Sequence, residues 1–413
     1  MTEPTEPQGP LSGLLVLDLS RVLAGPWVGQ TLGDLGAEVI KVERPGSGDD
    51  TRGWGPPFLK DRSGAETGEA AYFQCANRNK KSLTLDLANP EGQAILRRLA
   101  AQSDVLIENY KVGGLGKYGL DYPTLSADNP RLIYCSITGF GQTGPYAPRA
   151  GYDFLIQAMG GLMSITGRPD GAPGGGPQKV GVALTDIITG LYATIGILAA
   201  LAARERTGRG QHVDLALLDA QVASLANQAM NYLATGVSPQ RLGKAHPNIV
   251  PYQDLPTADG SMIVAVGNDQ QFARLCDVLG RPDWARDPRF VTNRGRVQHR
   301  AVLVPLLEAA TRERGTAAWI AALEPLGVPC GPVNSVGAAL EDPQVRARGL
   351  RISMPHPSAG SLDLVGSPIN LSDTPVSYRH APPLLGEHTR EVLSQLAGLS
   401  DAEIAGLAAR KVI

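Results

Sequence analysis

Residues 14–42 read LLVLDLSRVLAGPWVGQTLGDLGAEVIKV and contain two apolar runs with a helical segment between them. The runs Leu14–Leu19 and Glu38–Val42 are short and rich in aliphatic side chains, which is typical of buried strands. The intervening residues, Gly25–Gly36, fit a single helix. A strand, a helix and a second strand in this order indicate neighbouring parallel strands in a sheet.

The same alternation continues along the first half of the chain. Lys81–Leu87 alternates with a period of two, and Val105–Ile107 and Leu132–Ile137 are further expected strands. A helix is expected to begin at Asn89-Pro90, because Asn is a good N-cap and Pro suits the first helical position. We therefore expect an α/β fold with a mostly parallel sheet and helices on both of its faces.

The second half changes character near residue 234. An almost entirely apolar helix is expected before that point, and His212–Leu217 reads as another strand. Residues 235–251 are loop-like, because Gly, Pro, Ser and Asn are frequent in them. A smaller unit is then expected, which begins with a strand at Met262–Val266 and continues with charged helices.

Composition excludes several classes of protein. The 413 residues include 38 Lys and Arg against 40 Asp and Glu, so the concentrated positive charge of a nucleic-acid binder is not expected. The length exceeds what a single core usually supports, so two domains are expected. The four cysteines form no Cys-x-x-Cys pair, which argues against a zinc site or a disulfide framework; they are Cys75, Cys135, Cys276 and Cys330.

We expect a cytoplasmic protein with no membrane partner. Met1–Pro10 is acidic and lacks the apolar core of a signal peptide. The longest apolar stretch, Ile187–Ala203, is short for a membrane span, so a buried core helix is the better interpretation.

One glycine motif resembles a dinucleotide fingerprint. Gly114–Gly119 matches G-x-G-x-x-G and follows an expected strand. Asp121 and Pro123 interrupt the helix that should hold the pyrophosphate, and Gly139-Phe140 stands where the ribose-binding acid should lie. A nicotinamide or flavin site is therefore disfavoured, while an anion-binding loop of another kind remains open.

Cations gather near the ends of the expected strands. Ligands of open α/β sheets bind at the carboxyl ends of the strands, so such a group suits a phosphate-bearing ligand. Ordinary solvated surface charges explain it equally well. The residues are Lys41, Arg44, Lys80, Lys81, Lys111 and Lys117.

Asp186 is an isolated carboxylate among apolar neighbours at an expected helix start. One interpretation is an N-cap that interacts favourably with the helix dipole. The other is a carboxylate that the dipole keeps ionised for nucleophilic attack. No His-Glu-x-x-His or His-x-x-x-His spacing supports a metal site, and no G-x-S-x-G motif supports a serine hydrolase.

Short motifs along nearly the whole chain carry a resemblance to a known family. They are Leu11–Asp18, Gly36–Pro45, Asn79–Ser82, Ile107–Tyr110, Asn129–Ile133, Gly139–Pro145, Gly151–Asp153, Gln157–Gly161, Thr207–Gly210 and Pro383–His388. In these motifs the chain resembles the class III CoA-transferase family, of the formyl-CoA and carnitine CoA-transferase type.

The resemblance implies a fold and an assembly. A large Rossmann-like domain would be built from both chain ends, with a smaller α+β domain inserted between them. Each protomer would form an open ring, and two rings would interlock as a homodimer. The implied boundaries are 1–210 for the large domain, 211–235 for a linker, 236–326 for the small domain, and 327–413 for the return linker and the rest of the large domain.

The resemblance also implies a reaction and a site. Asp186 would be the nucleophile that takes CoA from an acyl-CoA donor and passes it to a free carboxylic acid, through an aspartyl anhydride and an aspartyl-CoA thioester. A CoA thioester would be the substrate, with no metal and no tightly bound cofactor. The implied CoA-binding residues are Val22, Leu23, Ala24, Arg44, Leu85, Ala88, Asn109, Tyr110, Lys117 and Tyr152.

Two alternatives accompany this reading. Racemases of α-methylacyl-CoA thioesters share the fold but use a histidine where this chain has Tyr152, and a glutamate near the place of Gln270. A phenol, with a usual pKa of about 10, is poorly matched to removing an α-proton at neutral pH. A non-catalytic acyl-CoA-binding protein is the second alternative.

The small-domain motifs resemble one branch of the family. The long Gly-rich loop of formyl-CoA transferases is missing, and Ala245–Gln253, Gly267–Asp269 and Gly331–Asn334 resemble the succinyl-CoA:dicarboxylate enzymes, which include the glutarate and hydroxymethylglutarate transferases. Succinyl-CoA is therefore the expected donor and a short dicarboxylic acid the expected acceptor. Arg149 and His246 are candidates to bind the acceptor's distant carboxylate.

Overall fold

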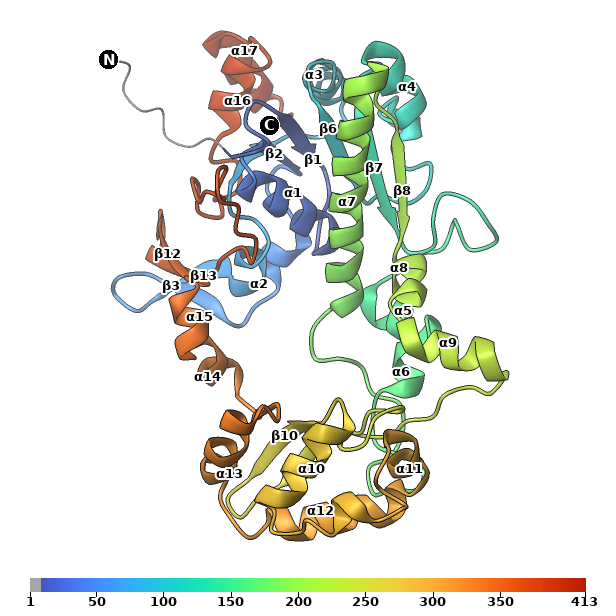
Figure 1. The fold of residues 1–413 in the computed structure, drawn as a ribbon. Helices are drawn as coiled ribbons and strands as arrows, with labels where there is room; N and C mark the ends of the chain where they lie inside the picture. The colour runs from blue at the N-terminus through green and yellow to red at the C-terminus, as the bar shows by residue number, and fades with distance from the viewer. Residues whose placement is uncertain (1–8) are drawn as a thin grey trace. The chain divides into compact units, whose positions relative to one another are not determined.

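The computed structural model describes residues 9–413, and the chain forms two compact units (Figure 1). The larger unit comprises the described residues up to Gly161, together with Val180–Ala229 and Gln344–Ile413. The smaller unit comprises Leu162–Lys179 and Met230–Pro343. The expectation that the chain has no signal peptide rests on Met1–Pro10, and most of this segment lies outside the described residues.

The larger unit is built on a six-stranded, entirely parallel sheet. Its strands, in spatial order, are β5 (Lys80–Thr84), β2 (Glu38–Glu43), β1 (Leu15–Asp18), β6 (Val105–Glu108), β7 (Ile133–Thr138) and β8 (His212–Ala216). Counted along the chain within the sheet, this order is 3-2-1-4-5-6, and it changes direction between β1 and β6. The predicted α/β fold with a parallel sheet is confirmed, and the change of direction marks where such sheets bind ligands.

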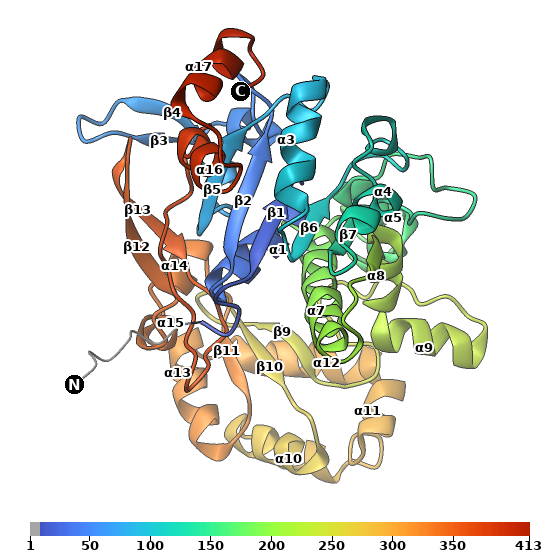
Figure 2. The same ribbon diagram turned by 90° about the horizontal axis from the view of Figure 1, so that it is seen from above.

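Helices cover both faces of this sheet (Figure 2). Neighbouring residues of a strand point to opposite faces, so Val16 packs in one apolar layer and Leu17 in the other. The layer around Val16 is completed by α1 (Ala24–Asp34) and α7 (Leu184–Thr207). The layer around Leu17 is completed by α3 (Pro90–Ala100), α16 (Thr389–Gln395) and α17 (Asp401–Ala409). Because both faces are buried, most side chains of the central strands are apolar. Among the charged exceptions, Lys41 and Lys80 are paired with Asp49 and Asp18.

Segments from the first and last parts of the described chain meet in the larger unit. Figure 1 shows the red helices α16 and α17 beside the blue strands. Asn79, which has a left-handed φ of 59°, donates a hydrogen bond to the Ser377 carbonyl and accepts one from the Arg379 N–H. These contacts join residues 298 and 300 positions apart. The returning segment is therefore part of the same core.

Local signals explain where several helices begin and end. The Asn89 side chain accepts a hydrogen bond from the Glu91 N–H at 2.9 Å, and Pro90 is the first residue of α3, as predicted. Helix α7 ends at Thr207 and is followed by Gly208, whose φ of 70° suits a glycine C-cap.

By length and composition α7 is long and apolar enough to cross a membrane, the one such helix within residues 9–413. Helices in the core of a soluble protein pass the same test. Ala193, Ile197 and Ala200 of α7 are buried against α1 and the sheet. One side of α7 is therefore a core face.

The smaller unit has its own α+β core. β11 (Cys330–Pro332), β10 (Ser261–Ala265) and β9 (Tyr252–Pro256) form an antiparallel sheet. Its apolar side chains pack with those of α10 (Asp269–Val278), α12 (Arg300–Thr311) and α13 (Thr316–Leu323).

The remaining elements are short. They are β3 (Phe58–Lys60), β4 (Glu66–Ala70), α2 (Ala71–Gln74), α4 (Tyr122–Asp128), α5 (Asp153–Met159), α6 (Leu162–Ile165), α8 (Leu217–Ala223), α9 (Ala226–Thr235), α11 (Asn293–Gln298), α14 (Val336–Leu340), α15 (Pro343–Ala347), β12 (Arg351–His356), β13 (Gly360–Val365) and the 3-10 turns Asp50–Gly53, Gly116–Tyr118, Trp284–Arg286 and Glu324–Leu326.

The unit boundaries differ from those implied by the sequence. The segment 211–235 is not a plain linker, because it contains β8, α8 and α9, and β8 is an edge strand of the central sheet. Leu162–Lys179 belongs to the smaller unit, where the Gly243 N–H donates to the Gly167 carbonyl at 3.1 Å and Arg241 pairs with Asp170. Contacts between residues about 70 positions apart attach Leu162–Lys179 to the smaller unit, so no local sequence pattern predicts this assignment.

Candidate active site

A cavity of about 430 Å³ lies at the carboxyl ends of the central strands, in the larger unit. It collects most of the residues that the sequence singled out, although they come from distant segments of the chain. Those in its lining are Val22, Leu23, Ala24, Asn109, Tyr110, Lys117, Arg149, Tyr152 and Asp186. A second cavity, of about 580 Å³, shares Arg21, Asp50, Tyr110 and Tyr118 with it and is lined by the remaining three of the implied CoA-binding residues, Arg44, Leu85 and Ala88.

The predicted cations separate into two groups. Arg44, Lys111 and Lys117 line the cavities. Lys41 and Lys80 are fully buried and paired with Asp49 at 2.9 Å and Asp18 at 2.8 Å. Lys81 pairs with Glu38 and Glu391, each at 2.8 Å, and is also absent from both linings. The phosphate-binding interpretation is therefore wrong for these three lysines, which hold the structure together.

Asp186 lies in the first turn of α7 and is 8% exposed. The N-cap is Ala183, so the interpretation of Asp186 as the capping residue is wrong. Within residues 9–413, no group donates a hydrogen bond to its carboxylate. Burial, together with the nearby Asp153 carboxylate, raises the pKa of Asp186 to about 7. A buried, unpartnered carboxylate that faces a cavity is suited to react with a substrate.

Asp153 is a site residue that sequence analysis did not single out. Its carboxylate accepts hydrogen bonds from the Thr185 N–H and from Gln157, both at 2.8 Å. Gln157 in turn accepts from the Val180 N–H at 2.9 Å. Asp153 thus fixes the residue that precedes Asp186 and places a second negative charge near it. Its position directly after Tyr152 in a quoted motif was the available signal.

Tyr72, on α2, is a second residue that sequence analysis missed. Burial raises its pKa to about 12, with contributions from Cys75 and Asp186, so its hydroxyl stays protonated. Tyr72 is absent from the linings of both cavities, so it contributes to the surroundings of Asp186 and not to the cavity wall. No sequence motif indicated this, because α2 is a four-residue helix remote from α7 in the chain.

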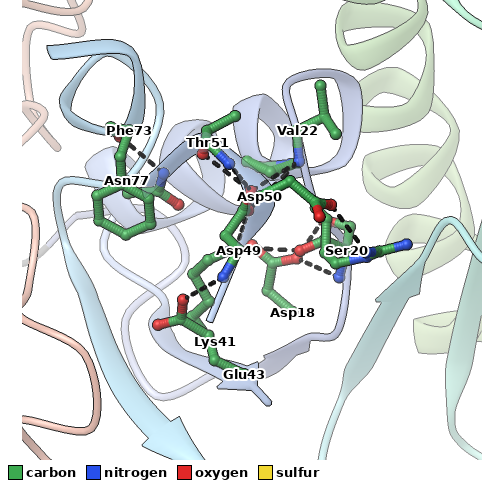
Figure 3. Close-up of polar contacts among 12 residues, drawn as sticks. Asp18, Ser20, Val22, Lys41, Glu43, Asp49, Asp50, Thr51, Phe73 and Asn77 are labelled. Carbon is green, nitrogen blue, oxygen red and sulfur yellow. Dashed lines mark hydrogen bonds and ion pairs between the residues drawn. The ribbon is translucent and has the colours of Figure 1, made fainter. Parts of the chain in front are cut away.

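The turn that joins β1 to α1 forms another part of the cavity wall. Val22 has a φ of 74°, in the left-handed region that a β-branched residue rarely adopts. Its N–H donates to both carboxylate oxygens of Asp49, at 3.2 and 3.3 Å (Figure 3). Burial alone would raise the pKa of Asp49, but Lys41 and Thr51 outweigh it and lower the pKa to about 2. Asp49 is therefore ionised at every physiological pH.

The glycine motif Gly114–Gly119 does not begin a phosphate-binding helix. It forms a 3-10 turn, and α4 starts only after Asp121. Gly114 and Lys117 nevertheless line the cavity that contains Asp186. Within residues 9–413, no group of three or more His, Cys, Asp or Glu side chains is placed to hold a metal ion.

Comparison with known proteins identifies the family. Residues 11–389 match the model of CoA-transferase family III. The chain belongs to this family. The resemblance found in the motifs is thereby confirmed, and the protein is an enzyme of the CoA-transferase class.

Relatives of this CoA-transferase cover nearly its whole length. It is 52% identical over 396 residues to the succinate–glutarate CoA-transferase of Agrobacterium fabrum, covering 96% of this chain and 98% of that one. It is 46% identical over 404 residues to the mouse succinyl-CoA:glutarate CoA-transferase, covering 98% and 90%. A crystal structure of a CAIB/BAIF family protein from Brucella suis superimposes with a TM-score of 0.83 at 53% identity, covering 95% and 100%.

The two candidate anchors for an acceptor acid lie in different units of this CoA-transferase. Arg149 lines the cavity with Asp186, and its guanidinium lies 4.5 Å from the Tyr146 ring centroid. His246 lies in the smaller unit, where its ring accepts a hydrogen bond from the Asn248 N–H at 3.1 Å. Burial, with the nearby Arg300, lowers the pKa of His246. His246 is therefore neutral at pH 7 and the weaker anchor for an anion.

Proposed function

We propose that this CoA-transferase moves CoA from succinyl-CoA to a short dicarboxylic acid such as glutarate. The observation that carries the proposal is the placement of Asp186 in a cavity at the carboxyl ends of the central strands, as a buried carboxylate to which no group of the described residues donates a hydrogen bond. The similarity to enzymes named for succinate, succinyl-CoA and glutarate supports the choice of donor and acceptor.

Asp186 begins the reaction as a nucleophile. It attacks the thioester carbonyl of succinyl-CoA, which breaks the C–S bond and gives a succinyl-aspartyl anhydride and CoA thiolate. The thiolate then attacks the aspartyl carbonyl, which releases succinate and leaves an aspartyl-CoA thioester. The acceptor carboxylate attacks that thioester, which breaks its C–S bond and gives an acceptor–aspartyl anhydride and CoA thiolate. The thiolate then attacks the acceptor's carbonyl of the anhydride, and the carboxylate of Asp186 leaves. The products are the new acyl-CoA and free Asp186.

Each of these steps passes through a tetrahedral oxyanion that needs hydrogen-bond donors. Helix α1 begins at Ala24, in the lining of the cavity, and the first N–H groups of a helix have no partner within it. In α1 these are the N–H groups of Ala24 and Gly25, because Pro26 has none and the Trp27 N–H donates to the Leu23 carbonyl. We assign the oxyanion to this helix end. A well-placed donor is worth about 3–4 kcal/mol in comparable sites.

The two adjoining cavities suit the length of CoA. The nucleotide end lies in the second cavity, beside Arg44, Leu85 and Ala88. The chain to the thioester passes Tyr110, which both cavities share, and ends at Asp186. Lys117 supplies positive charge to the phosphates. No metal or tightly bound cofactor takes part in these steps.

Arg149 is the proposed anchor for the distant carboxylate of the acceptor. It lies in the same cavity as Asp186, and the planar guanidinium of an arginine can bind a carboxylate through two parallel hydrogen bonds. His246 is a second candidate, but its lowered pKa makes it a weaker anchor for a carboxylate.

We also propose an interlocked homodimer with a Rossmann-like larger unit. Helices α5, α7 and α8 pack together and expose large apolar side chains, and such a patch is typical of a covered surface. These side chains are Phe154, Leu155, Met159, Leu191, Tyr192, Ile195 and Val222. All four cysteines are free, as expected in the reducing cytoplasm, which is the proposed location.

A substrate panel tests the proposed function. The protein is incubated with succinyl-CoA and one acid at a time, and the CoA esters are identified by mass spectrometry. We expect glutaryl-CoA, with hydroxylamine trapping an adduct on Asp186. If no acid yields a new ester and no adduct forms, the protein binds acyl-CoA without turnover. If deuterium enters the α-carbon of a 2-methylacyl-CoA in the absence of an acceptor, the protein is a racemase.

A further inference from the structure

We propose that Asp49 is a positioning residue for CoA transfer, because it holds the Val22 turn in the shape that faces Asp186. The inference rests on the proposed role of Asp186 as the nucleophile. It starts from the strained backbone at Val22, whose φ of 74° is unfavourable for a β-branched residue. Such a conformation persists only where the surroundings impose it.

Hydrogen bonds from side chains of other segments hold the backbone at and before Val22. The Val22 N–H donates to both oxygens of Asp49, at 3.2 and 3.3 Å. Two residues earlier, the Ser20 carbonyl accepts a hydrogen bond from the Lys41 ammonium at 3.0 Å. Between them, the Arg21 backbone exchanges two hydrogen bonds with the Asn109 side chain, at 3.0 and 2.7 Å. Three consecutive residues are thus held through their backbone, by side chains from other segments of the chain.

Asp49 is the member of this group that is itself most firmly fixed. It is 1% exposed and accepts from Lys41 at 2.9 Å and from the Thr51 hydroxyl and N–H at 2.8 and 3.0 Å. Figure 3 shows its carboxylate between Lys41, Thr51 and Val22. Its own N–H donates to Glu43 at 3.0 Å. The carboxylate therefore transmits the position of β2 to the turn.

The turn reaches the reacting atoms through the cavity wall. Val22, Leu23 and Ala24 line the cavity that also contains Asp186, and α1 begins at Ala24. If Val22 relaxed to a negative φ, the first N–H groups of α1 would move relative to Asp186. A displacement of about 1 Å at a reacting centre lowers a rate about a hundredfold.

The test compares Asp49→Asn with a control that is equally buried. We expect Asp49→Asn to lower kcat at least tenfold. Asp49 is in the lining of the second cavity but only 1% exposed, so the dissociation constant of CoA should change less than threefold. Asp34→Asn is the matched control, because Asp34 is buried and paired with Arg78 at 2.5 Å but is not among the contacts of Ser20–Val22. It should lower the melting temperature and leave kcat within twofold. Equal losses of kcat in both variants would overturn the proposal.

A rescue experiment separates positioning from general stability. Glycine adopts a φ of 74° without strain, so Val22→Gly reduces the need for the Asp49 contact. We expect Val22→Gly to raise the kcat of Asp49→Asn at least threefold. Additive losses from the two substitutions would contradict the inference.

Two further results keep the outcome clear. If Asp49→Asn does not fold, hydrogen exchange of the parent protein decides, since the Val22 amide must exchange at least a hundredfold slower than an open-chain amide. Fast exchange overturns the inference.

Adduct formation on Asp186 separates the two proposals. Without an adduct in the parent protein the proposed function fails, and an adduct that forms equally fast in Asp49→Asn refutes only the role of Asp49.

Discussion

At the scale of single residues, the environment of Asp186 has opposing effects on a nucleophile. Burial and Asp153 raise its pKa to about 7, which reduces the ionised fraction at neutral pH. The same shift makes the ionised carboxylate more basic and leaves it poorly solvated, so it is more reactive once formed. Both effects can be measured separately.

The first prediction concerns Asp186→Asn. The pKa of this carboxyl is about 3.8 in the unfolded chain and about 7 when folded, so it favours folding below pH 4 and loses that contribution as the pH rises to 7. Removing the charge should therefore raise the melting temperature at pH 8 and change it less at pH 4. Transfer activity should be abolished. A large loss of stability at pH 8, measured by calorimetry, would contradict this account.

The second prediction concerns the pH dependence of adduct formation. Only ionised Asp186 attacks the thioester, so the single-turnover rate should rise with pH, with a midpoint near 7. Asp153→Asn removes the neighbouring charge and should move the midpoint to lower pH. Asp219→Asn is the control, because Asp219 is an exposed acid on α8 and makes no contribution to the shift. An unchanged midpoint in Asp153→Asn would show that burial alone sets the pKa.

At the scale of elements, α1 packs closely on the sheet because it carries glycines at the contact. A Cβ atom at Gly29 would lie 2.6 Å from the Asp18 carboxylate and 3.1 Å from the Lys80 side chain. Both belong to the buried pair that links β1 to β5. The close approach of helix and sheet brings the first turn of α1 to the cavity wall.

The third prediction follows from this contact. Gly29→Ala should destabilise the protein by about 2 kcal/mol, because overpacking outweighs the gain of about 1 kcal/mol in helix propensity. Gly337→Ala on α14 is the control, since its nearest neighbour, the Ser335 hydroxyl, lies 4.0 Å from the new Cβ. The control should be neutral or slightly stabilising. Urea denaturation measures both, and equal effects would show that the contact at Gly29 is unimportant.

The same scale shows what local patterns can and cannot predict. The strands and the start of α3 follow from apolar periodicity and from an Asn-Pro cap, both of which lie within a few residues of sequence. The pairing of Lys80 with Asp18 joins residues 62 positions apart. No local pattern distinguishes this buried lysine from Lys117, which lines the cavity.

At the scale of the whole molecule, α5, α7 and α8 expose large apolar side chains, which is typical of an interaction surface. The fourth prediction is that the protein is a dimer and that Ile195→Glu disrupts it, because Ile195 is 60% exposed on α7 and a buried charge there would be unpaired. Val302→Glu, on α12 of the smaller unit, is the control and should leave the dimer intact. Light scattering coupled to gel filtration measures the mass. A monomeric parent protein would contradict the proposal.

Apolar periodicity, cap residues and family motifs were enough to predict a parallel α/β sheet and CoA transfer, and they singled out Asp186. Those signals lie in residues that are close in the sequence, so they can be recognised without knowledge of the packing. Only the tertiary structure showed that Asp153 lies beside Asp186, that Lys41 is buried against Asp49, and that residues 162–179 belong to the smaller unit. Each of these depends on contacts between distant segments. Such contacts arise from the packing of the complete chain, which no short stretch of sequence encodes.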